Sequence, residues 1–226
     1  MSDKYPNISP YVYCANNPVK LVDPDGKEIT IPPWFILKTI ARVVEYYSTN
    51  SDIKTVAYTI NHPINAIKVK YDYNVAATNF QINIGKAINC PQNTDGSPQN
   101  AIRHTLWQAL ITRDYGAVQA ERIGAAHEDN IPFNTNIRLF SSREEADEVV
   151  DLLNNEIGRR VGENNPSANN RDMAKYVMKE YYSAGLWTVK SNNNGSYTIE
   201  KTKISIKQYY AAINEINKKG ENGLNQ

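Results

Sequence analysis

Two histidines lie in polar stretches that could build a catalytic site. His104 is in the run Asn100-Ala-Ile-Arg-His-Thr-Leu-Trp-Gln-Ala-Leu110, and His127 is followed directly by Glu128. Neutral imidazole is a good zinc ligand, and a neighbouring glutamate can act as a further ligand or as a general base. We therefore expect His104 and His127 to share a divalent metal ion, zinc or calcium, with His104 and Glu128 also acting in catalysis.

A carboxylate and an amide lie four residues apart at Asp151 and Asn155, so they point the same way on a helix. Aspartate can bind a metal ion or orient an imidazole ring, and we expect Asp151 to be the third metal ligand. Arg103 and Arg159 could bind an anionic group of the substrate, because guanidinium pairs well with phosphate. We expect Asn155 to contact the substrate as well.

Each of these features also has a simpler structural explanation. A single histidine on a helix is more often a packed core residue, and His127-Glu128 could be a polar helix end. Trp107, one turn after His104, could line a substrate pocket or anchor the core. The coincidence of polar faces beside apolar stripes on three successive helices favours a shared site, with Trp107 as a substrate contact.

Helical spacing of apolar residues predicts the elements that must position these side chains. Residues 51–88 combine strand-like alternation with helical spacing, and we favour a helix. The turn Asn192-Asn-Asn-Gly195 between apolar runs predicts a β-hairpin, and Gly220 onward should be a frayed end. The fold class expected is mainly α, a helical bundle-like domain with a small C-terminal β-hairpin and a Pro-rich extended N-terminal segment. The helices expected are 34–47, 99–114, 117–129, 142–161 with a capping box at Ser142, 170–184 capped by Asn170 or Asp172, and 205–218.

The first 28 residues are rich in proline, which breaks helices and favours extended backbone. The run Tyr5-Pro-Asn-Ile-Ser-Pro-Tyr-Val-Tyr-Cys-Ala-Asn-Asn-Pro-Val-Lys-Leu-Val-Asp-Pro-Asp-Gly26 resembles the C-terminal end of an RHS-repeat core. In that family the segment closes a β-cage and a variable toxin domain follows it. The resemblance implies that 1–28 is the RHS-core remnant or linker and that 29–226 is an α-helical effector domain. Lys27 stands where the family usually has leucine.

A second resemblance covers about residues 62–162. The ordered motifs Asn100-Ala-x-Arg-His-x-x-Trp, His127-Glu128 and Asp151-x-x-Asn-Asn-x-x-Gly-Arg159 are similar to a family of uncharacterised bacterial domains at the ends of secreted or RHS-type proteins. That family supplies no reaction. It implies functional roles for Arg103, His104, His127, Glu128, Asp151, Asn155 and Arg159.

The composition limits the classes of function that the sequence supports. With 25 basic and 24 acidic residues the net charge is +1, which weighs mildly against a nuclease. No apolar run is long enough for a membrane span, and the polar start lacks a signal-peptide layout. Two cysteines, Cys14 and Cys90, form neither a disulfide framework nor a metal pattern.

These observations favour an antibacterial toxin that a specialised secretion system, such as type VI, delivers into target bacteria. Its chemistry would be metal-assisted hydrolysis of a phosphoester or a lipid ester. The Arg103-His104 pair is similar to the Arg-His-Asp helix of small bacterial phospholipases, with Thr105 where they carry aspartate. The expected partners are a cognate immunity protein, the RHS cage with its secretion apparatus, and a lipid or nucleic-acid substrate. A nuclease toxin and a pore-forming toxin without catalysis are the alternatives.

Overall fold

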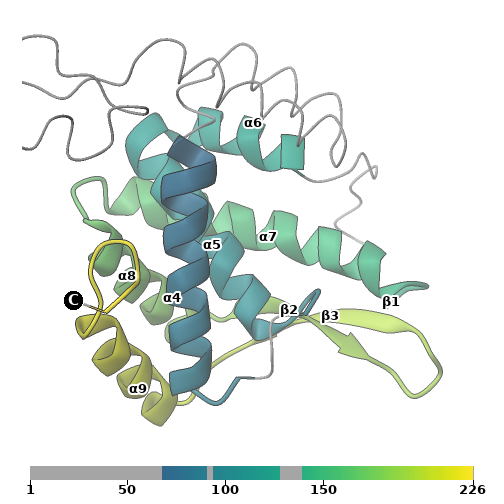
Figure 1. Ribbon diagram of the computed structural model, residues 1–226. Helices are drawn as coiled ribbons and strands as arrows, with labels where there is room; N and C mark the ends of the chain where they lie inside the picture. Colours follow the sequence, from purple (N-terminus) through teal and green to yellow (C-terminus); the bar gives the residue numbers. More distant parts are fainter. Residues whose placement is uncertain (1–67, 91–93, 128–138, 226) are drawn as a thin grey trace, which may run out of the picture. The chain divides into compact units, whose positions relative to one another are not determined.

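The computed structural model describes residues 68–90, 94–127 and 139–225, which form a group of helices with a small antiparallel sheet at one side (Figure 1). These residues belong to one compact unit, Ile64–Gln226. In chain order the elements are η2 (Val69–Tyr73), α4 (Asn74–Ala87), α5 (Pro98–Tyr115), α6 (Ala117–His127), β1 (Leu139–Phe140), α7 (Arg143–Asn164), α8 (Asn170–Ser183), β2 (Leu186–Ser191), β3 (Tyr197–Thr202) and α9 (Ile206–Asn217). The expected mainly α class with a C-terminal hairpin is confirmed. The Pro-rich segment 1–28 and the helix expected at 34–47 lie outside the described residues.

Two serine caps set where the central helices begin. Ser97 precedes α5 with extended backbone, and its Oγ accepts a hydrogen bond from the backbone N–H of Asn100 at 3.2 Å. Ser142 precedes α7 in the same way, and its Oγ accepts from the N–H of Glu145 at 3.1 Å. A serine oxygen here satisfies one of the N–H groups that a helix start leaves unpaired. The serine cap expected at Ser142 is confirmed, but the reciprocal bond of the expected capping box is not formed, because the Glu145 side chain accepts from Ser141 Oγ at 2.9 Å.

Glycines let α7 lie directly against the backbone of α5. A Cβ on Gly158 would be 2.3 Å from the carbonyl oxygen of Thr105, and one on Gly162 would be 2.5 Å from that of Ala109. Because the contacted positions increase together on both helices, α5 and α7 run parallel. This close approach brings two polar faces together.

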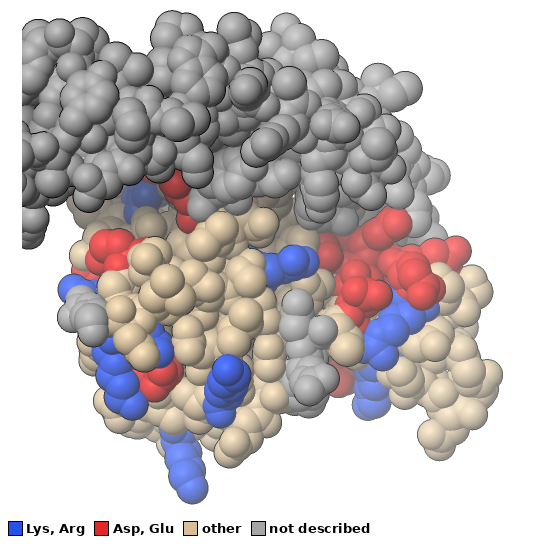
Figure 2. All heavy atoms as spheres, in the orientation of Figure 1, with Lys and Arg blue, Asp and Glu red and all other residues tan. Residues whose placement is uncertain are grey.

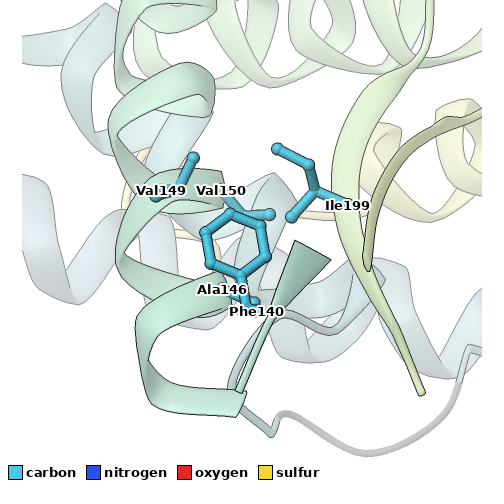
Figure 3. Close-up of a cluster of buried hydrophobic side chains, with 5 residues drawn as sticks. All are labelled: Phe140, Ala146, Val149, Val150 and Ile199. Atoms are coloured by element: carbon cyan, nitrogen blue, oxygen red, sulfur yellow. The ribbon is translucent and has the colours of Figure 1, made fainter. Parts of the chain in front are cut away.

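The hairpin packs beside the start of α7. β2 and β3 pair antiparallel from Leu186↔Thr202 to Ser191↔Tyr197, and the expected hairpin is confirmed. The short strand β1 adds to the other side of β3 through Phe140↔Tyr197, a pairing that no local sequence pattern indicates. A hydrophobic cluster joins the sheet to α7 (Figure 3). It contains Phe140, Ala146, Val149, Val150 and Ile199.

The segment with mixed periodicity is helical. Its start, Val69–Tyr73, forms a π-helical turn that leads directly into α4. The helical interpretation is confirmed for residues 69–87. Phe80 on α4 is fully buried. The apolar repeat of α4 therefore packs into the core rather than alternating as a strand would.

The C-terminal tail is not frayed, so that expectation was wrong. The backbone at Gly223 lies against Phe80 of α4, where a Cβ would be 2.9 Å from the Phe80 nitrogen. The side chain of Asn79 donates to the carbonyl oxygen of Asn222 at 2.8 Å, and Glu221 accepts from the N–H of Asn170 at the start of α8. Polar tail residues are thus held by hydrogen bonds to two helices. In the described part of the chain, no helix is both long and apolar enough to cross a membrane.

Candidate active site

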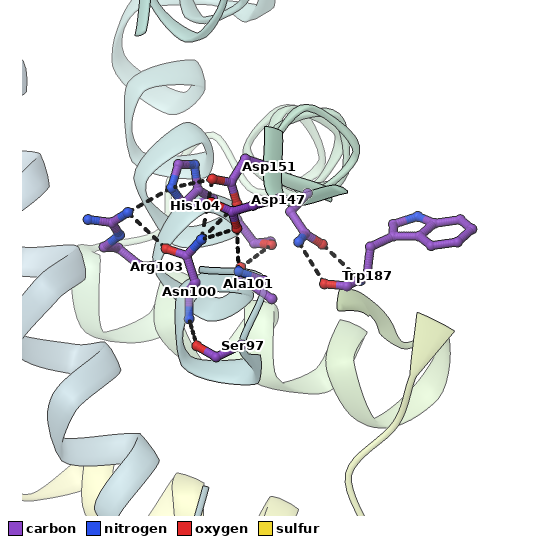
Figure 4. A network of polar contacts seen from close by, with 11 residues as sticks. Ser97, Asn100, Ala101, Arg103, His104, Asp147, Asp151 and Trp187 are labelled. Carbon is purple, nitrogen blue, oxygen red and sulfur yellow. Dashed lines mark hydrogen bonds and ion pairs between the residues drawn. The ribbon is translucent and has the colours of Figure 1, made fainter. Parts of the chain in front are cut away.

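Asn100 links both sides of the polar face between α5 and α7 (Figure 4). Its Nδ2 donates to Asp151 Oδ1 at 2.9 Å and to Asp147 Oδ1 at 3.1 Å, while its Oδ1 accepts from Arg103 Nη2 at 2.8 Å. The amide is therefore oriented by a cation on one side and two carboxylates on the other. Asn100 lies one turn before His104 on the same face of α5. It holds the Asp151 carboxylate beside that histidine.

His104 and Asp151 form a buried pair. Nε2 of the ring lies 3.3 Å from Asp151 Oδ2, and the two side chains are 4% and 6% exposed. The same Nε2 is 2.8 Å from Arg103 Nη2. A single ring nitrogen carries either a proton or a lone pair. It accepts from Arg103 when the lone pair is free, and it donates to Asp151 once it is protonated.

This arrangement suits general acid–base catalysis. Histidine changes charge near neutral pH, and a carboxylate beside it orients the ring and stabilises the imidazolium that forms. Trp107 lies edge-on to the His104 ring, with centroids 6.3 Å apart and planes at 78°. Its indole, 8% exposed, borders the ring and limits its rotation. The structure thus brings together Arg103, His104, Trp107 and Asp151, and the catalytic, substrate-binding and metal-binding roles expected of them stay predictions.

Asp147 is a member of the cluster that residue type and spacing did not single out. Burial raises its pKa to about 6, the charge of Asp95 adds to the rise, and hydrogen bonds from Gly96 N–H and Asn100 oppose it. Figure 2 shows acidic side chains gathered over the start of α7, whose first turn carries Glu144 and Glu145. Asp147 can therefore exchange a proton near neutral pH, and the side-chain amide of Asn100 connects it to Asp151.

Two further residues of the expected site do not join the His104 cluster. Asn155 is fully buried one turn along α7 from Asp151. Arg159 is half-buried one turn beyond Asn155, about 12 Å along the helix axis from Asp151. In the described part of the chain Arg159 makes no hydrogen bond or ion pair. Its expected role in binding an anionic group stays a prediction, as does the substrate contact of Asn155.

The expected contribution of α6 falls largely outside the described residues. α6 ends at His127, whose side chain lies outside them, as does all of Glu128. Gly124, one turn before His127, faces the amides of Gln108 and Asn155, where a Cβ would be 2.7 Å from Gln108 Nε2. This glycine admits side chains of α5 and α7 rather than another helix backbone.

The donor set for a metal ion is incomplete among the described residues. No group of three or more His, Cys, Asp or Glu residues there could hold a metal ion. Both carboxylate oxygens of Asp151 lie within hydrogen-bonding distance of Asn100 Nδ2, at 2.9 and 3.3 Å. A metal on this carboxylate would have to share those oxygens with the amide N–H groups. The zinc or calcium ion expected on His104, His127 and Asp151 stays a prediction.

The fold and the site define a helical domain with a buried histidine–aspartate pair between two parallel helices. The chain belongs to the family described as Domain of unknown function (DUF6973), which matches residues 56–185. The match spans α4 to α8 and so contains every described residue of the site. No curated protein and no solved structure matches the chain. The matched range does not include residues 5–26, whose RHS-core resemblance stays a prediction.

Proposed function

We propose that this protein is an antibacterial effector domain, the C-terminal cargo of an RHS protein, and that it hydrolyses a phosphoester or a lipid ester. The delivery part of the proposal is supported by the sequence of residues 5–26. It implies export through a specialised secretion system and a cognate immunity protein in the producing cell. The hydrolase part is supported by the polar cluster between α5 and α7.

The contact between His104 and Asp151 is the observation that carries the chemistry. Nε2 of His104 and Oδ2 of Asp151 are 3.3 Å apart in a site with little solvent, where electrostatic interactions are strong. In the resting state Nε2 accepts from Arg103. An anionic group of a substrate would draw the Arg103 guanidinium away and leave Nε2 ready to take a proton.

The proton of the attacking water can then pass through His104 to the leaving group. An attacking water gives its proton to Nε2, and the nearby Asp151 carboxylate stabilises the positive charge of the imidazolium that forms. The same N–H can then return the proton to the leaving oxygen. Asp147, with its raised pKa, is a second source of a proton beside Asn100. In the metal-assisted form of this proposal, a zinc or calcium ion on His104, His127 and Asp151 would activate the water, with Glu128 as general base.

The experiment is a growth assay with the domain directed to the cytoplasm or to the periplasm of a susceptible bacterium. We expect the wild type to inhibit growth and His104→Ala, Asp151→Asn and Glu128→Ala to relieve it. Thr105→Val is the matched control, because Thr105 is fully buried beside His104 but bonds only the helix carbonyl of Ala101 among the described residues. Undiminished killing by His104→Ala would overturn the proposal.

The purified protein identifies the bond that is cleaved. Incubation with phospholipid vesicles and with phosphodiester substrates should release fatty acid or phosphate-bearing products, with and without chelator. Loss of activity with chelator, restored by zinc or calcium, supports the metal-assisted form, and full activity supports the histidine–aspartate pair alone. Cleavage of DNA or RNA instead would support the nuclease alternative, and dye leakage from vesicles without product release would support the pore.

A further inference from the structure

Two fully buried amide side chains lie one turn beyond the His104–Asp151 pair. Gln108 is on α5 and Asn155 on α7, and both have no exposed surface. All four of their amide atoms lack a hydrogen-bond partner in the described part of the chain. Leaving a buried donor or acceptor unpaired costs about 1–3 kcal/mol. Folded proteins therefore supply such groups with a partner, very often an internal water.

The two amides face the same point on α6. A Cβ on Gly124 would be 2.7 Å from Gln108 Nε2 and 3.4 Å from Asn155 Nδ2. Gly124 thus leaves room for the Gln108 amide, which a Cβ at this position would displace, and lies beside the Asn155 amide. Three helices surround this polar spot. A ligand there must both donate and accept hydrogen bonds, because an amide presents N–H groups and an oxygen.

The spacing of the helix turns connects this spot with the histidine. Gln108 follows His104 by four residues and Asn155 follows Asp151 by four, which corresponds to about 6 Å along each helix. Two hydrogen bonds through one water oxygen span about 5.6 Å. One water molecule bound to the amides is therefore large enough to bridge the distance of one helix turn to the His104–Asp151 pair.

We propose that Gln108 and Asn155, facing Gly124, form an internal water-binding site that hydrogen bonds both amides and extends to the His104–Asp151 pair. The proposal rests on burial and geometry, not on the proposed function, so it stands or falls independently of any hydrolase activity. The neutral, two-way hydrogen bonding of the amides selects water over an ion. Such a site gives a buried histidine a route for proton exchange.

Oxygen-17 magnetic relaxation dispersion of water counts long-lived internal water molecules in the folded protein. We expect the double variant Gln108→Leu/Asn155→Leu to lose at least one such water relative to the wild type, and each single variant to lose water as well. Thr105→Val is the matched control, because Thr105 is equally buried but bonds the carbonyl oxygen of Ala101 at 2.8 Å. It should keep the count of the wild type.

Equal water counts in the wild type and the double variant would overturn the proposal. If the double variant does not fold, electron density of the wild type decides. Density for a water within hydrogen-bonding distance of both amides supports the site, and amides bonded directly to protein groups overturn it. The wild-type structure needs no substrate and no active enzyme, so its outcome is separate from that of the growth assay.

Discussion

Gly158→Ala tests the packing that holds the two halves of the site together. A methyl group there would be 2.3 Å from the carbonyl oxygen of Thr105 and 2.8 Å from Cβ of Gln108. Ordinary contacts between such atoms are about 3.5 Å, so α5 and α7 would have to separate by about 1 Å. The displaced segment of α5 lies directly after His104. The substitution should therefore also widen the contact of His104 with Asp151.

Two opposing effects set the magnitude for Gly158→Ala. Overpacking a close contact costs about 1–3 kcal/mol, and a backbone atom is the obstacle here, which favours the upper part of that range. Alanine gains about 1 kcal/mol over glycine in a helix interior. We expect a net loss of about 1–2 kcal/mol in the free energy of unfolding. For a domain of this size that lowers Tm by about 2–8 °C.

Urea and thermal denaturation of the purified protein measure this loss. Glu156→Ala is the matched control, because Glu156 is exposed on the same helix and alanine meets nothing there. It should leave the free energy of unfolding within about 0.5 kcal/mol of the wild type. If Gly158→Ala is as stable as the wild type, or more stable, the helix propensity of alanine dominates. That result would refute direct backbone contact between α5 and α7 as the dominant effect at Gly158.

Three further predictions follow from the same contacts. Asp147 has its pKa raised from 3.8 to about 6, so the folded state binds this proton more tightly than the unfolded state and loses stability as pH rises through that interval. The Tm of Asp147→Asn minus that of the wild type should therefore increase between pH 4 and 6 and stay at its higher value above pH 6. A Tm difference that is constant from pH 4 to 8 in thermal melts would contradict this. Asn154→Ala removes two 3.0 Å hydrogen bonds to the backbone of Trp187 and should cost about 1–3 kcal/mol in urea denaturation. Glu221→Gln removes a negative charge from the start of α8 and should cost about 0.3–1 kcal/mol, with a loss that shrinks in high salt.

Local patterns predicted most of the helices, because each pattern is determined by neighbours in the sequence. The polar run before Gln99 and the glycine at 116 delimit α5, which the structure extends by one residue at each end. The cap of α8 was misplaced by one residue, since Asn169 rather than Asn170 accepts from the N–H of Asp172. Adjacent asparagines offer the same chemistry, and only the backbone path selects between them.

Contacts between segments that are far apart in the chain could not be predicted from local sequence patterns. β1 is only two residues long, and its pairing with Tyr197 depends on a segment far along the chain. The C-terminal tail was expected to fray because it is polar and contains glycine. Its order depends on Asn79 and the start of α8, which no pattern within the tail can reveal. Composition describes a segment's own tendency, whereas docking depends on its partner.

The candidate site was predicted in part for the same reason. Spacing placed His104 and Asp151 on polar faces, and their type indicated acid–base chemistry. Asn100 and Asp147 were missed because an amide and a carboxylate acquire a role only from the groups opposite them. The four-residue repeats of Asn100, His104 and Gln108, matched by Asp147, Asp151 and Asn155, are the signal that could have found them.

That shared repeat raises the question of what fixes the register between α5 and α7. The glycines at 158 and 162 are also four residues apart, so sliding one helix by a turn would preserve close packing. The same slide would move Asp151 from His104 to Gln108. Asn100 opposes it, because its Nδ2 donates to both aspartates and its Oδ1 accepts from Arg103. Close packing thus holds the helices together, and the hydrogen bonds from Asn100 and from the Gly96 N–H to Asp147 favour the register that creates the His104–Asp151 pair.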